Sequence, residues 1–200
     1  MTVMNTPAVL EIRVYLRNGH VARFVQTDAL IARQILEAIH PHRLFTAPQL
    51  LIGSDHVLTA FQTSLVVRVD LITDLDHDWS LSSGILNTRE ITEIEFETRC
   101  HPDSDVHRLT SQEIVVFGVW EMANGERIFL QTHATDLEKR KLPTDVGLFM
   151  QQVMTSGALL ARGQEAGYIV LNPASLMRFT SYVGLRELPA NALPMRQITD

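Results

Sequence analysis

The sequence predicts an α+β protein built from two diverged tandem copies of a mostly antiparallel β unit, each with one covering helix. Alternating apolar and polar residues, the pattern of half-buried strands, recur in both halves of the 200-residue chain. Asn-Gly, the pair that a type I′ hairpin turn favours because both central residues need positive φ, stands at Asn18–Gly19 and again at Asn124–Gly125. Each half also carries one amphipathic segment of helical period.

In the first half, strands are predicted where β-branched and apolar residues alternate with polar ones between turn residues. These strands are 9–16, 21–26, 49–52, 57–61, 65–72, 85–86 and 90–98. The strand at 90–98 rests on the alternation ITEIEFET within it. A helix is expected from Thr27 or Asp28, either of which can cap it, to about Ile39, and Pro41 ends it.

The second half repeats this order of elements. A helix over 144–154 is capped by Thr144 or Asp145, carries one apolar stripe, and is followed by Gly157, where a C-cap is expected. The strands expected around it are 113–122, 127–131, 168–171 and 175–183.

Residue matches support an internal repeat. The two Asn-Gly pairs are 106 positions apart, whereas residues 24–27 (FVQT) match residues 129–132 (FLQT) at a shift of 105. Residues 61–65 resemble residues 171–176, which would close each copy. We therefore expect a first α+β unit at 1–80, an inserted strand and linker at 81–107, and a second unit with a C-terminal tail at 108–200.

Composition restricts the functional classes. A net charge of −6, with no local basic patch, opposes binding to nucleic acid, which rests on many cationic contacts. The single cysteine, Cys100, excludes an intrachain disulfide and gives no support to secretion. No run approaches the roughly 18 apolar residues that span a bilayer, and the N-terminus lacks a signal-peptide pattern. We therefore expect a cytoplasmic protein that binds neither nucleic acid nor a membrane.

Two groups of residues invite a metal-binding interpretation. His40 and His42 are one residue apart and could both reach one ion, and Asp74, Asp76 and Asp78 alternate like the opening of an EF-hand loop. The histidine pair has no third ligand at a recognisable spacing. The acidic loop has tryptophan where an EF-hand needs glycine, and isoleucine where it needs glutamate. We therefore predict no bound metal and no cofactor.

Other catalytic patterns are missing from the sequence. Gly53-Ser54-Asp55-His56 holds the residue types of a hydrolase triad, but neighbours on one tight turn cannot converge as a triad must. The glycines between Gly157 and Gly167 have neither phosphate-loop nor dinucleotide-binding spacing. Adjacency of His101 to Cys100 does not activate the thiol.

These observations favour a non-catalytic binding or assembly module that acts through a groove between its two units or through edge strands. We expect self-association into a homo-oligomer, or binding to another protein, because small open sheets leave unpaired edges. The edges expected to be free are 90–98 and 175–183. The alternative function is a small metal-assisted hydrolase that uses His40, His42 and the 74–78 acidic loop.

Overall fold

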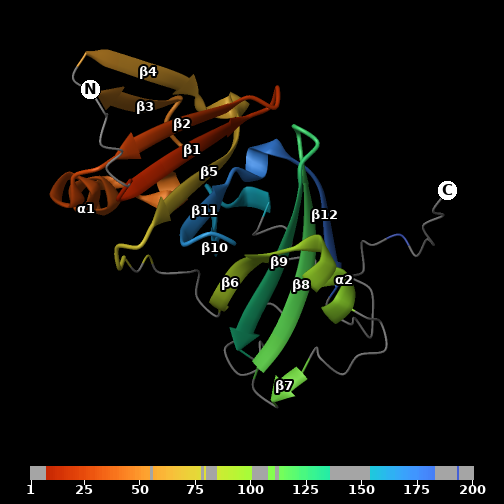
Figure 1. Ribbon diagram of the computed structural model, residues 1–200. Coiled ribbons are helices and arrows are strands. Elements are labelled where there is room, and N and C mark those ends of the chain that lie inside the picture. Colours follow the sequence, from red (N-terminus) through yellow and green to blue (C-terminus); the bar gives the residue numbers. More distant parts are fainter. Residues whose placement is uncertain are drawn as a thin grey trace.

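The protein is an α+β fold organised around one large mixed sheet (Figure 1). The structure, a computed structural model, describes residues 8–54, 56–77, 79, 85–100, 108–110, 113–135, 154–182 and 193. In the described ranges, nine strands follow one another in the order β12-β8-β9-β6-β10-β11-β5-β1-β2, β7 pairs with β8 beside this path, and β3 and β4 form a separate hairpin. Pairing is antiparallel except between β6 and β10.

The first hairpin and helix form as predicted. Strands β1 (Leu10–Leu16) and β2 (Val21–Gln26) flank the Asn18–Gly19 turn, where Gly19 has a φ of 81°. Helix α1 (Ala29–Ala38) is capped by Asp28, whose carboxylate accepts hydrogen bonds from the first-turn backbone amides. The rest of the first half is a 3-10 turn (Pro41–Arg43), β3 (Gln49–Ser54), β4 (Val57–Gln62), a second 3-10 turn (Thr63–Leu65) and β5 (Val66–Thr73).

The predicted strand at 90–98 is wrong. Strand β6 (Ile85–Ile91) includes only the first two residues of the predicted strand, and helix α2 (Glu93–Arg99) follows it. Thr92 caps this helix by accepting a hydrogen bond from the Glu95 amide at 3.1 Å. Thr92 to Glu95 has the T-x-x-E spacing of a capping box, a helix-start signal that the alternation of apolar residues obscured.

The second half contains one strand that the sequence pattern missed. Strand β10 (Leu159–Arg162) has only four residues between two glycines, so it lacks a readable alternation. The helix expected at 144–154 lies outside the described residues except for its last residue, Met154. The remaining elements are β7 (Arg108–Thr110), β8 (Glu113–Met122), β9 (Arg127–Thr135), β11 (Gly167–Leu171), a 3-10 turn (Pro173–Ser175) and β12 (Leu176–Tyr182).

Equivalent hydrogen bonds close the β1–β2 and β8–β9 hairpins, and the residues that make them are 106 positions apart. The amide of Leu16 donates to the carbonyl of His20 and that of Met122 to Glu126, each at 2.9 Å. The strand registers on both sides of the turns follow the same shift of 106 residues. The match of FVQT to FLQT at 105 is therefore out of register by one residue, a slip that would turn every side chain to the other face. Phe24 corresponds to Leu130, and both face a core.

The closing strands, β5, which pairs with β1, and β12, which pairs with β8, also have matching registers. In β1–β5 the register shifts between Tyr15 and Leu16, and in β8–β12 it shifts between Leu176 and Arg178. Adding 106 to the residue numbers of β1 gives those of β8, and adding 110 to those of β5 gives those of β12. The pair Tyr15–Arg68 then becomes Glu121–Arg178, so the two irregularities lie at equivalent positions. Each closing strand follows a 3-10 turn that begins immediately after its hairpin or one residue later.

The halves are joined by antiparallel pairing of β5 with β11 (Figure 1). Side chains of both halves share one core, in which Leu160 and Tyr168 pack with Val14, Val69 and Leu71. Strand β6 lies between β9 and β10 and pairs with both. Packing at the junction is close, because a Cβ added at Gly167 would lie 2.0 Å from the carbonyl oxygen of Leu71.

We predict that Gly167→Ala is considerably more destabilising than Gly125→Ala. Both glycines have positive φ, 112° and 85°, so alanine costs about 1–2 kcal/mol in backbone strain at either position. Only position 167 adds the clash with Leu71, which raises the loss by roughly another 1–3 kcal/mol. Urea unfolding monitored by circular dichroism measures both losses. Equal losses would contradict the close approach of β11 to β5.

Candidate functional site: a charged pocket between the halves

A pocket of about 180 Å³ lies where the two halves meet. Strands β1 and β5 of the first half supply Arg13, Tyr15, Arg68 and Asp70 to its wall, and β6, β11 and the turn before β11 supply the opposite side. The second set of lining residues includes Glu90, Gln164, Glu165 and Tyr168.

Arg68 is the centre of the pocket's charge network. Its side chain is only 9% exposed and its three guanidinium nitrogens all donate to carboxylates. Asp70, two residues along β5, accepts from two of these nitrogens. Glu90 of β6 accepts at 2.8 and 3.1 Å, and Glu126, in the β8–β9 turn, accepts at 2.9 Å. One buried cation therefore holds three separate parts of the chain together.

The ring of Tyr15 completes the surroundings of Arg68. It lies under the guanidinium, 5.1 Å from ring centre to carbon, and its hydroxyl donates to Asp70 at 2.9 Å. Burial, and after it the charge of Asp70 and the hydrogen bond to it, raise the pKa of Tyr15 to about 12. Burial opposes the charged form of Arg68, but Asp70 and Glu90 outweigh it, so the pKa of Arg68 is raised.

A second ion pair, between Arg13 and Glu165, also lines the pocket. Arg13 of β1 donates to both carboxylate oxygens of Glu165 at 2.8 and 3.1 Å, which links the halves again. It also donates to Glu11, which is shared with Arg23. These hydrogen bonds, Arg13 before Arg23, lower the pKa of Glu11 against the opposing effect of burial.

The chemistry of this pocket is that of a structural junction. Its carboxylates are held by arginines and its arginines by carboxylates, so the described network offers neither a poised base nor an activated nucleophile. The pocket is also smaller than the roughly 300 Å³ at which typical ligand sites begin. The arrangement is suited to fixing the relative position of β1, β5, β6 and β11.

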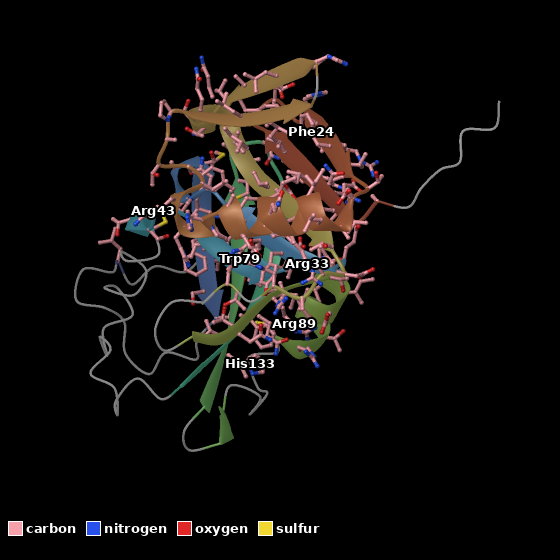
Figure 2. The ribbon with its side chains drawn as sticks, turned by 90° about the vertical axis from the view of Figure 1, so that its left-hand side faces the viewer. Phe24, Arg33, Arg43, Trp79, Arg89 and His133 are labelled. Atoms are coloured by element: carbon pink, nitrogen blue, oxygen red, sulfur yellow. The ribbon has the colours of Figure 1, made fainter. Side chains whose placement is uncertain are left out.

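A larger groove, of about 320 Å³, separates β2 from the β3–β4 hairpin. Figure 2 shows Phe24 of β2 near this hairpin, and its ring meets that of Phe61 edge-on with centres 5.9 Å apart. In the second half, β6 occupies the corresponding place between β9 and β10. The second half therefore has a strand, β6, at the place where the first half has a groove between β2 and the β3–β4 hairpin.

The residues considered for a metal site lie on separate loops. His40 precedes a 3-10 turn that contains His42, whereas Asp74 and Asp76 follow β5. Asp78 lies outside the described residues. Among the residues that the structure describes, no group of three or more histidine, cysteine, aspartate or glutamate side chains could hold a metal ion.

The arginines beside the hairpins have partners within the chain. Arg17 donates to the carbonyl of Ala174 at 3.0 Å, and Arg23 donates to Glu11. Arg127 donates to Glu93 at 2.8 Å. Figure 2 places Arg89 near His133, and Gln131 connects them by accepting from Arg89 and contacting the His133 ring nitrogen at 3.0 Å.

Local sequence patterns do not predict that Arg68, Asp70, Glu90 and Glu126 form a set. A signal was present in β5, VVRVDLIT, where two opposite charges interrupt a mostly apolar strand. Charged side chains are almost never fully buried unless paired, so such a strand predicts partners elsewhere. Nothing in the sequence indicates that these partners are Glu90 and Glu126.

No family model matches this chain, and no match was found among the curated proteins or the solved structures. In the part of the chain that the structure describes, none of the helices combines the length and apolarity needed to cross a membrane.

We predict that Arg68→Met lowers the free energy of unfolding by about 3–5 kcal/mol, because it leaves Asp70 and Glu90 buried without their cation. Arg23→Met is the control. It removes an arginine whose side chain is 62% exposed and pairs with Glu11, so solvent replaces much of what is lost. Urea unfolding compares the two variants, and similar losses would argue against Arg68 as a buried centre.

Proposed function

We propose that this protein is a non-catalytic, cytoplasmic assembly module made of two diverged copies of one α+β unit, and that it associates with itself through strand edges. The observation that carries this proposal is the β5–β11 junction, where one half of the chain already joins the other by strand pairing. Strand β12 has the place in the second half that β5 has in the first. The same kind of pairing is therefore available between chains.

The proposed duplication is supported by details that local turn preference does not explain. Asn-Gly turns recur in hairpins for local reasons. A shared register irregularity in the closing pair, at matching positions, requires two strands far apart in the sequence to meet in the same way. We accordingly divide the chain into a first unit at 1–80, an insertion at 81–107 that contributes β6, and a second unit at 108–200. We also propose that the second unit has a covering helix at 144–154, of which only Met154 lies in the described residues.

The edge of β12 is suited to association. It is the last strand of the sheet, and no described strand pairs with its outer side. Met177 and Tyr182 on this strand are 74% and 41% exposed. Natural proteins commonly protect free edges with lysine or proline, and β12 has neither. Exposed apolar side chains on an unprotected edge favour pairing with another chain over hydration.

Self-association is tested by light scattering on a size-exclusion column at micromolar concentration. We expect a discrete multiple of the 22.5 kDa chain mass, because symmetric contacts that close give one defined oligomer. A monomeric mass would overturn the proposal and leave another protein as the partner. A continuous range of masses would contradict closed contacts.

The alternative of a metal-assisted hydrolase at His40 and His42 has a separate test. We expect the purified protein to contain no stoichiometric zinc, iron or manganese, because two histidines without a third ligand rarely retain an ion. Elemental analysis by mass spectrometry measures this directly. About one metal per chain, lost in the His42→Ala variant, would replace the assembly proposal with the enzymatic one.

A further inference from the structure

We infer that β12 of one chain pairs with β4 of a second copy, in the register that joins β5 to β11 within the chain, and packs against the outer face of the β3–β4 hairpin. This inference rests on the proposed function and specifies its contact surfaces. The chain contains one hairpin, β10–β11, that is docked on a neighbouring strand, and one corresponding hairpin, β3–β4, that is not.

The docked hairpin is β10–β11. Leu160 and Tyr168 on its outer face are each only 5% exposed, because they pack with Val14, Val69 and Leu71 of the first half. Strand β11 pairs with the edge of β5 while its outer face enlarges the core of that unit. The junction thus combines backbone pairing with burial of apolar side chains.

The undocked hairpin is β3–β4. It is followed by the same 3-10 turn and closing strand as β10–β11, with β4 and β11 separated by 110 residues. Leu51 and Leu58 occupy the positions of Leu160 and Tyr168 in the hairpin register. They are 55% and 69% exposed. Two leucines therefore face solvent where their counterparts are buried by strand pairing.

The surface that these leucines fit is β12, the counterpart of β5. Phe179 of β12 takes the position of Val69 and lies half-buried beside Trp120, with ring centres 5.2 Å apart. It provides an apolar surface for the β3–β4 hairpin to cover. Transferred by 110 residues, the β5–β11 register pairs Leu58 with Ser181, Thr59 with Thr180, Ala60 with Phe179 and Phe61 with Arg178.

The strand pairing between β12 and β4 is expected to stop before Val57. The residue of β11 that corresponds to Val57 is Gly167, where even a Cβ would clash with the backbone of β5. Valine at this end keeps the strands apart, so the paired segment is shorter between chains than within the chain. We infer that the contact between chains is weaker than the junction between halves.

A second copy is the occupant that these observations select. Each chain carries one docking strand and one receiving hairpin, so the two surfaces are matched in number. The contact is heterologous, with different surfaces on the two partners, and it closes into a ring when the rotation between chains permits. Pairing of β12 with β12 of a partner would instead be isologous, and the two arrangements are separable by experiment.

Cysteine cross-linking tests the register. In a Cys100→Ser background, Thr59→Cys and Thr180→Cys are prepared as separate proteins, mixed and oxidised. Residues opposite one another in an antiparallel pair lie about 4.5–5.5 Å apart at Cα, within the range for a disulfide. We expect a covalent dimer in the mixture and none from either protein alone. Cross-linking of Thr180→Cys with itself would overturn the inference in favour of paired β12 strands.

The mass of the protein in solution distinguishes failure of the inferred β12–β4 contact from failure of the proposed self-association. An oligomer whose mixture gives no cross-link retains the assembly function and refutes this surface. A monomer refutes both.

A charge placed on the hairpin provides a second test that does not need oxidation. Leu58→Lys should weaken association by roughly tenfold or more, since it places a lysine in an apolar contact. Leu30→Lys is the control, because Leu30 is 67% exposed on α1, outside the inferred contact. Circular dichroism confirms that both variants fold. Equal association of the two variants would contradict the inference.

Discussion

The position of the Arg68 guanidinium constrains the whole sheet. A buried cation is tolerated only when carboxylates neutralise it, and those around Arg68 come from β5, from β6 and from the turn between β8 and β9. If β6 were not inserted beside β10, Glu90 could not reach it. If the second hairpin turned elsewhere, Glu126 could not reach it. The electrostatic requirement thus favours one arrangement of the halves over others that would bury the same apolar area.

A second polar contact acts at the same junction. The side-chain amide of Asn172, which is 3% exposed, donates to the carbonyls of Thr63 and Val66 at 3.1 and 2.7 Å. Its backbone amide donates to the carbonyl of Val67. Apolar packing alone tolerates small sliding of one strand along another, whereas these directional bonds do not. Asn172 therefore fixes the end of β11 against the start of β5, whereas Arg68 connects β5 to β6 and to the β8–β9 turn.

Local patterns in the sequence carried much of the fold. Both Asn-Gly hairpins, α1 and the β3–β4 hairpin form where turn residues and periodicity indicate. Errors arose where two periodicities overlapped or a signal was short. The alternation through Ile91, Ile94 and Phe96 suggested a strand, but the cap at Thr92 and burial of Phe96 against other aromatic rings made a helix. The strand order and the partners of Arg68 depend on long-range contacts, which no local window contains.

Pairing between β5 and β11 also determines when the sheet can be completed during synthesis. Val69 pairs with Val170, which is about a hundred residues later in the chain. At a translation rate of roughly 5–20 residues per second, β5 exists for about 5–20 s before its neighbour is made. Five of its eight residues are apolar, and one edge is unpaired throughout this interval. Arg68 and Asp70 interrupt this apolar run, and polar residues at such positions reduce the tendency of an exposed strand to aggregate before its neighbour is made.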